Sequence, residues 1–198
     1  SEEPGFEVGW NLTQLVRGVD LADGLRIFDA LWAEYPDVMA SQWKDFKVLW
    51  IIPSLATSIF TVDKPIRTMA DFKGLQLRVP NRINADFMQA LGAAPISMST
   101  PDWITSLDKG TTDGGTNTIS GMLDFQIADK LKYATLFPLG CTINFLIMNM
   151  DSWNKLSPDQ QKAIDDSLAD ARKSAIEAWA GAEQEAEEYS LEKGMEFI

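Results

Sequence analysis

The sequence predicts an α/β protein, because short apolar strands alternate with amphipathic helices along much of its 198 residues. Residues 75–79 alternate apolar and polar side chains as a strand does, and residues 81–91 then repeat apolar side chains at helical spacing. The same order of strand and helix recurs over residues 95–110. Repeated units of this length predict a parallel sheet with helices on both faces. A hydrophobic content of 45% is sufficient to bury a core in one or two domains.

The chain before this region is expected to contribute one helix and two strands. Residues 20–35 place apolar side chains three and four positions apart, which predicts an amphipathic helix that ends before Pro36. Residues 47–52 are almost continuously apolar, as is typical of a strand buried on both faces. A second strand is expected at residues 56–62, after a break at a proline.

Residues 68–81 are expected to form a short helical turn and a strand with an arginine at its end, and they are the most informative stretch of the sequence. Thr68 and Asp71 have the spacing of a helix cap, and Gly74 is expected to end that short turn. Arg78 then falls where a strand gives way to a loop. An arginine at the carboxyl end of a strand faces the crevice where open α/β sheets bind ligands, and its planar guanidinium matches a carboxylate. A surface arginine in an ordinary salt bridge is the alternative interpretation.

Two more helices are expected in the middle of the chain. Thr100 reads as the cap of a helix with Pro101 at its first position, and Trp103 falls on the buried side of that helix. Residues 111–115 are small and polar and are expected to form a connection. A further helix is predicted at residues 119–126.

The C-terminal part is dominated by one long helix. Ser157 and Gln160 form a capping box around a proline, and a helical composition continues to Lys193. At 1.5 Å per residue such a helix would extend roughly 55 Å, so it must bend or cross between domains. Three further strands are expected, at residues 131–137, 142–150 and 195–198.

Composition excludes several classes of function. A net charge of −12 and a pI near 4.4 argue against nucleic acid and anionic membrane surfaces as partners. No apolar run approaches twenty residues, so no direct membrane insertion is expected. The absence of histidine excludes Ser-His and Cys-His triads and His-ligated zinc sites. No cofactor or metal motif is found, and the single Cys141 is expected to be a buried, inert thiol.

The charge is unevenly distributed along the chain. Residues 157–198 carry eleven acidic against four basic residues, whereas residues 63–82 carry five basic against two acidic ones. Because the whole molecule repels anions at long range, an anionic ligand would have to be captured by short-range hydrogen bonds in this basic stretch. A set of merely solvated basic residues is the alternative.

Three segments together resemble the solute-binding protein family of tripartite ATP-independent periplasmic (TRAP) transporters. They read DKPIRTMADFKGLQLRVP, LGAAPISMSTPDWITSLDKGTTDGGTN and MNMDSWNKLSPDQQKAI, and the resemblance runs from about Leu21 to the end. It implies a two-lobe periplasmic-binding-protein-like fold with crossing strands and a long C-terminal helix. Residues 1–55 would form part of lobe one, residues 56–143 the carboxylate-binding lobe two, and residues 144–198 a return to lobe one with the long helix. By comparison with the family, the N-terminal part of lobe one is missing and the chain is expected to be truncated at both ends.

The resemblance also implies a set of ligand-binding residues. Arg78 matches the arginine that holds the ligand's carboxylate, and Asn117 matches the family's asparagine, although a helix cap is its alternative role. Thr116 replaces a common glutamate, Ser58 stands where many members have a second arginine, and Thr100 stands where some sialic-acid-binding members have an aromatic residue. These departures make sialic acid a less expected ligand. The residues expected to bind ligand are Arg78, Asn117, Ser58, Thr100, Thr116 and Asn144.

Three functions stay open at this point. The first is a periplasmic binding protein without catalytic activity that delivers a small organic acid to the membrane subunits of a TRAP transporter. The second is a carboxylate-dependent hydrolase or lyase, for which Asp102, Asp108 and Asp113 are the candidate acids. The third is a sensory domain with the same fold.

Overall fold

The computed structural model describes residues 21–53, 57–137 and 143–198, and the chain divides into two compact units. The first unit comprises residues 1–56 and 140–180, and the second comprises residues 57–139 and 181–198. Cys141 lies outside the described residues. The expected lobe boundaries, with residues 1–55 and 144–198 in lobe one and residues 56–143 in a carboxylate-binding lobe two, stay a prediction.

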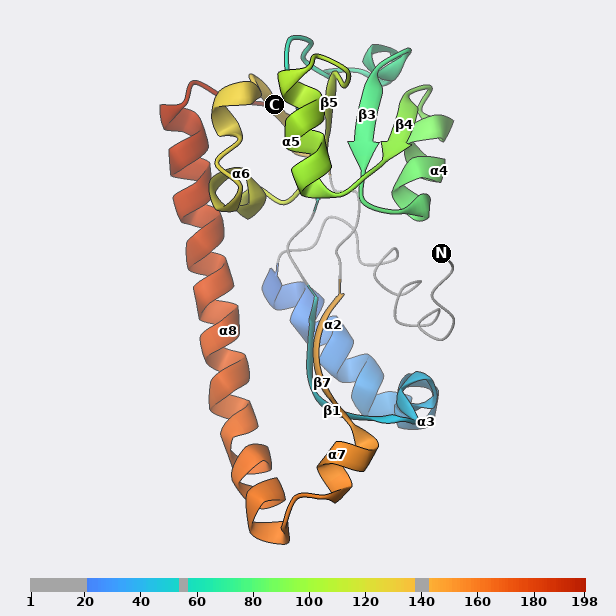
Figure 1. The fold of residues 1–198 in the computed structure, drawn as a ribbon, viewed down its shortest axis with the longest axis vertical. Helices are drawn as coiled ribbons and strands as arrows, with labels where there is room; N and C mark the ends of the chain where they lie inside the picture. Colours follow the sequence, from blue (N-terminus) through green and yellow to red (C-terminus); the bar gives the residue numbers. More distant parts are fainter. Residues whose placement is uncertain (1–20, 54–56, 138–142) are drawn as a thin grey trace. The chain divides into compact units, whose positions relative to one another are not determined.

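The first unit contains the predicted N-terminal helix and a two-stranded antiparallel ladder. Its elements are α2 (Leu21–Glu34), α3 (Pro36–Ala40), the 3₁₀ turn η1 (Ser41–Trp43), β1 (Phe46–Pro53), β7 (Ile143–Asn149), α7 (Met150–Asn154) and the beginning of α8 (Pro158–Glu192). Strands β1 and β7 pair from Phe46 opposite Asn149 to Pro53 opposite Ile143, with a bulge after Val48 (Figure 1).

The prediction that residues 47–52 are buried on both faces is wrong for most of the strand. Ile52 is fully buried, but the side chains of residues 46–51 are only half buried. Within the described residues β1 has one strand neighbour, β7, on which Phe145 and Leu146 are exposed. The continuous apolar run therefore predicted the strand correctly but overestimated how far its side chains are buried.

The second unit is built on a six-stranded sheet in the order β4-β3-β5-β2-β6-β8. The strands are β2 (Ser58–Thr61), β3 (Gln76–Val79), β4 (Ala94–Ser97), β5 (Gly114–Asn117), β6 (Tyr133–Thr135) and β8 (Glu196–Phe197). They are joined by the 3₁₀ turns η2 (Met69–Phe72) and η3 (Ala128–Lys130) and by the helices α4 (Arg82–Ala90), α5 (Thr100–Asp108) and α6 (Ser120–Asp124).

The sheet is mixed rather than parallel, which corrects the prediction from the repeating units. Strand β3 runs parallel to β4 and β5, whereas β2 runs antiparallel to β5 and β6. Parallel strands need a crossover that usually contains an α-helix. The link from β2 to β3 contains only the short turn η2, so these two strands run in opposite directions.

Strand β5 was predicted as part of a polar connection. Its sequence Gly-Gly-Thr-Asn has no apolar side chain, yet it lies between β3 and β2 inside the sheet. A Cβ on Gly114 would lie 2.1 Å from the carbonyl oxygen of Phe60, so only glycine allows this close approach. The position of β5 in the sheet therefore depends on its contacts with neighbouring strands, and the hydrophobic pattern of its own sequence does not indicate them.

The core of the second unit lies on both faces of its sheet. On one face Leu77 and Val79 pack with Phe72 and with Met88 of α4. The other face buries a separate cluster (Phe60, Trp103, Met122, Ile127, Ala128, Leu131, Ala134 and Met195), to which α5, α6 and the end of the chain contribute. The prediction of helices on both faces is thus confirmed (Figure 1).

Helix α8 begins at the predicted capping box. The Ser157 N–H donates to Gln160 Oε1 over 2.8 Å, and the Gln160 N–H donates to Ser157 Oγ over 3.3 Å. Residues 158–180 belong to the first unit and residues 181–192 to the second. No helix in the described part of the chain combines the length and the apolar character that crossing a membrane requires.

Replacement of Ser157 by alanine tests the importance of this cap. We expect it to lower the free energy of unfolding by about 0.5–2 kcal/mol, because the N–H groups of the first turn lose an acceptor. Ser167→Ala is the matched control, since Ser167 lies inside the same helix and donates only to the Ile164 carbonyl. Urea unfolding of both variants measures the difference, and an equal effect of the two substitutions would contradict the role of the cap.

Candidate ligand-binding site

Arg78 is held at the carboxyl end of β3 by three hydrogen bonds. Its Nε–H donates to the Met98 carbonyl and its Nη1–H to the Thr116 carbonyl, each over 2.9 Å. Its Nη2–H donates to Thr100 Oγ1 over 3.3 Å. The Trp103 ring lies 5.7 Å from the guanidinium carbon. The neighbouring strand, loop and helix therefore fix the orientation of the guanidinium.

The charge of Arg78 is buried, and the described part of the chain offers it no negative partner. Its exposed fraction is only 5%, and burial lowers the pKa of the guanidinium from its ordinary value. Among the described residues no carboxylate forms an ion pair with it, and three of its five N–H donors are used by neutral oxygens. Two donors thus stay available for an anion, which would also offset the cost of burying the charge.

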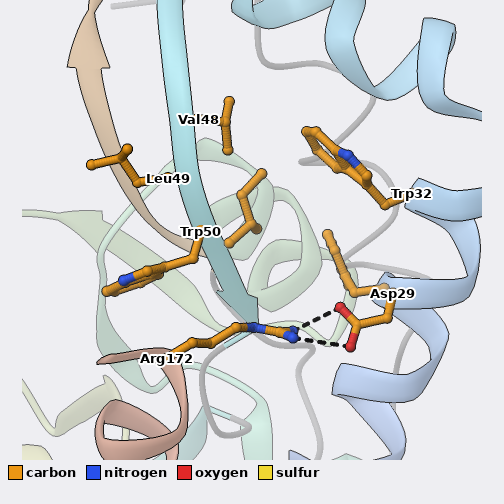
Figure 2. Close-up of a pocket in the computed structure, with 8 residues that line it drawn as sticks. Asp29, Trp32, Val48, Leu49, Trp50 and Arg172 are labelled. Carbon is orange, nitrogen blue, oxygen red and sulfur yellow. Dashed lines mark hydrogen bonds and ion pairs between the residues drawn. The ribbon is translucent and has the colours of Figure 1, made fainter. Parts of the chain in front are cut away.

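A second arginine, in the first unit, shows the opposite arrangement. Arg172 lines a pocket of about 240 Å³ together with aromatic side chains that include Trp32 and Trp50. Its Nη1–H and Nη2–H donate to the two carboxylate oxygens of Asp29 over 3.1 and 2.7 Å (Figure 2). The charge of Arg172 is therefore already neutralised by Asp29, whereas no described carboxylate neutralises that of Arg78.

The register of the sheet places further polar residues on the same face as Arg78. Arg78 lies beside Gly115 in the β3–β5 ladder, and Asn117, two residues on, lies opposite Ser58 of β2. Because alternate side chains share a face, Arg78, Ser58 and Asn117 point to one side. Asn117 Oδ1 accepts from the Thr118 N–H over 2.9 Å, whereas its Nδ2 is buried and has no hydrogen-bond partner in residues 21–53, 57–137 and 143–198. Free donors of Arg78 and Asn117 thus lie on one face of the sheet.

Comparison with known families identifies the class of protein. The family model described as bacterial extracellular solute-binding protein, family 7 (DctP), matches residues 35–198. The chain belongs to this family.

Individual relatives are consistent with this assignment. A solute-binding protein of Roseobacter denitrificans is 30% identical over 139 residues, which is 70% of this chain and 43% of that protein. A TRAP solute-binding protein of an unidentified marine microbe, specific for aromatic acids and crystallised with 3-hydroxybenzoate, has a TM-score of 0.75 and 32% identity, with 85% and 54% of the two chains covered. A TRAP protein of Chromohalobacter salexigens with bound D-glucuronate has the same fold (TM-score 0.85, 23% identity, 98% and 65% covered). The chain thus spans about half the length of its relatives.

The remaining residues predicted for this solute-binding protein lie in different environments. The prediction that Thr100 caps α5 is wrong, because the cap is Ser99, whose Oγ accepts from the Asp102 N–H. Thr100 Oγ1 instead accepts a hydrogen bond from Arg78. Thr116 contributes its carbonyl to Arg78, while strand alternation turns its side chain to the opposite face. Asn144 lies on β7 in the first unit, and its role stays a prediction.

The three carboxylates considered for catalysis all have local structural partners. Asp102 accepts from Ser99 Oγ at the start of α5, and Asp113 accepts from the Gln76 N–H over 2.7 Å. Asp108 forms an ion pair with Lys130 and thereby raises the pKa of that lysine. Among the described residues no three acidic or cysteine side chains gather closely enough to hold a metal ion.

Gly115 provides a stability test of the packing under Arg78. A Cβ at this position would lie 2.8 Å from Arg78 Cβ and 2.8 Å from the fully buried Trp103 ring. We therefore expect Gly115→Ala to lower the free energy of unfolding by about 1–3 kcal/mol. Gly181→Ala is the control, because a Cβ there meets no atom within 4 Å and alanine favours the helix by about 1 kcal/mol. Denaturant unfolding that shows both variants to be stabilised would contradict the tight packing.

One residue near the site was missed by the sequence analysis. Glu183 of α8 reaches the segment that follows Asn117, although 66 positions separate the two residues in the sequence. It is one of many acidic residues in α8, so charge alone does not distinguish it. The sequence contains a weak indication of its role. The small residues Ala186 and Ser190, which are buried, follow Glu183 at helical spacing and therefore place it on the buried face of α8.

Proposed function

We propose that this chain is the ligand-capturing part of a periplasmic TRAP solute-binding protein that binds a small organic acid and delivers it to the transporter's membrane subunits. The observation that carries the proposal is the buried guanidinium of Arg78, which lacks a carboxylate partner among the described residues. A ligand carboxylate would supply the missing negative charge. The proposal includes no catalytic step.

The free donors of Arg78 favour a carboxylate over a neutral ligand. A guanidinium forms two parallel N–H···O bonds with a carboxylate, and charge-assisted bonds are about twice as strong as neutral ones. The carbonyls of Met98 and Thr116 and the hydroxyl of Thr100 hold the guanidinium in place before the ligand arrives. This reduces the ordering cost of binding, because the rotamer of Arg78 is already selected.

The neighbouring polar groups would recognise the rest of the acid. The Nδ2 of Asn117 can donate to a second ligand oxygen, and Ser58 on the same face adds a small hydroxyl in place of a long cationic side chain. The marine relative that binds aromatic acids makes 3-hydroxybenzoate the first acid to test. The Asp102, Asp108 and Asp113 carboxylates, each engaged in a local contact, favour binding over the hydrolase or lyase alternative.

A thermal-shift screen of organic acids tests the function. Keto acids, C4-dicarboxylates, sugar acids and aromatic acids would each be compared with a neutral analogue, such as 3-hydroxybenzamide for 3-hydroxybenzoate. An acid that binds the folded state stabilises it by about 2.7 kcal/mol at a concentration of 100 Kd, which raises the melting temperature. We expect at least one acid, and not its amide, to produce a shift. Equal shifts with both members of every pair would contradict carboxylate recognition, and NMR detection of turnover would favour an enzyme.

A further inference from the structure

Glu183 of α8 holds the segment that follows Asn117. One carboxylate oxygen accepts from the Ile119 N–H over 3.2 Å, and the other accepts from the Ser120 N–H over 2.9 Å. A single side chain in the last third of the chain thus binds two successive backbone N–H groups at the start of α6. These groups are among the orphan donors of a helix terminus, and the N-cap residue of α6, Ile119, has no side chain that could accept from them.

The segment from Asn117 to Gly121 transmits this contact to the Asn117 amide. The Thr118 N–H donates to Asn117 Oδ1, and Thr118 Oγ1 in turn accepts from Ser120 Oγ over 3.0 Å and from the Gly121 N–H over 3.3 Å. A Cβ on Gly121 would lie 2.7 Å from Asn117 Nδ2, so the amide packs directly on the first turn of α6. Any shift of Ile119 and Ser120 would therefore move the amide.

We propose that Glu183 is a positioning residue, which fixes the Asn117–Gly121 turn so that the buried Asn117 Nδ2 is presented to the ligand. The proposal rests on the proposed function, in which an organic acid is the ligand and Asn117 Nδ2 donates to it. It deepens that function, because it assigns part of the affinity to a side chain on α8 that does not itself contact the acid.

The environment of Glu183 supports a specific role. Burial raises the pKa of its carboxyl group, while the hydrogen bonds from Ser120 and Ile119 act in the opposite direction and the nearby Glu187 adds to the increase. A partly buried acid is costly to maintain unless its oxygens are bonded. Here both oxygens are bonded, and both donors belong to the turn that carries Asn117.

A double-mutant cycle separates positioning from a direct or merely structural role. Asn117→Ala and Glu183→Ala are each expected to weaken the affinity for the acid selected in the thermal-shift screen, roughly 2- to 10-fold, as for the loss of one hydrogen bond. If Glu183 acts through Asn117, the double variant binds no more weakly than Asn117→Ala alone. Multiplied effects in the double variant would overturn the proposal. Glu185→Gln, an exposed change on the same helix, is expected to bind like the wild type.

A measurement without ligand keeps the two proposals distinguishable. In NMR spectra of the free protein, Glu183→Gln, which keeps one acceptor oxygen, is expected to shift the Thr118 backbone amide and the Asn117 side-chain amide, and Glu183→Ala to shift them further. Glu185→Gln should leave both signals in place. If the wild type binds none of the acids, the proposed function fails while these shifts still decide the positioning role. Unchanged Thr118 and Asn117 signals in both Glu183 variants would overturn it.

Discussion

Replacement of Arg78 by alanine is expected to weaken binding of the organic acid by about 2–5 kcal/mol, which is the cost of removing one partner of a buried charge pair. Arg78 as a whole is only 5% exposed, so a carboxylate bound to it would be shielded from water. Without the arginine the carboxylate would stay buried and unpaired. Isothermal titration calorimetry of the wild type and the variant measures the difference.

Two further substitutions make the result specific to the guanidinium. Arg78→Lys keeps the positive charge but loses the planar fork, so we expect it to recover only part of the lost affinity. Arg82→Ala, four residues along the chain, removes an arginine whose side chain is 79% exposed and lies near Asp86. We expect affinity close to that of the wild type, because exposed pairs contribute about 0–1 kcal/mol. Equal losses in Arg78→Ala and Arg82→Ala would point to general charge attraction instead.

Truncation of Trp103 to alanine is expected to cost the second unit about 3–5 kcal/mol of unfolding free energy. The indole is fully buried under the sheet, packs against Phe60 and Met122, and donates its Nε1–H to the Gly114 carbonyl over 3.1 Å. Its removal leaves a cavity beneath Gly115 and takes one hydrogen bond from the Gly114 carbonyl. Urea unfolding followed by circular dichroism measures the loss.

The hydrogen bond and the packing of Trp103 can be separated by a milder change. Trp103→Phe keeps most of the ring volume but removes the hydrogen-bond donor. We therefore expect its unfolding free energy to lie between those of the wild type and the alanine variant. Phe125→Ala is the control, because that ring is 42% exposed and a surface truncation of this kind changes stability little. A loss in Phe125→Ala that equals the loss in Trp103→Ala would contradict the assignment of Trp103 to the core.

Much of the fold was predictable because local signals agree with it. The cap at Ser157 and the proline after it define the start of α8, and the alternation around Arg78 defines β3. Arg78 could be singled out because it falls at the carboxyl end of this strand and matches the ligand-binding arginine of the family that the sequence resembles. These features depend on neighbours in the sequence, which a single chain displays directly.

The rest of the site depends on contacts between distant segments. Strand β5 carries Gly115 and Asn117 but has no hydrophobic pattern. Its two glycines leave no room for a side chain, because a Cβ would lie 2.8 Å from Trp103 at Gly115 and 2.1 Å from the Phe60 carbonyl oxygen at Gly114. Without β5 there is no register to align Asn117 with Ser58. Glu183 was harder to predict, because the main feature that distinguishes it from the exposed acids of α8 is its pair of hydrogen bonds to Ile119 and Ser120, which lie more than 60 positions away in the sequence.

The most direct test of the account is a crystal structure of this chain with the organic acid that gives the largest thermal shift. We expect the two carboxylate oxygens to lie about 2.7–2.9 Å from the terminal nitrogens of Arg78, with the existing bonds to Met98 and Thr116 retained. An acid bound elsewhere, for example at the Trp32–Arg172 pocket, with Arg78 bonded only to neutral oxygens, would contradict the central claim.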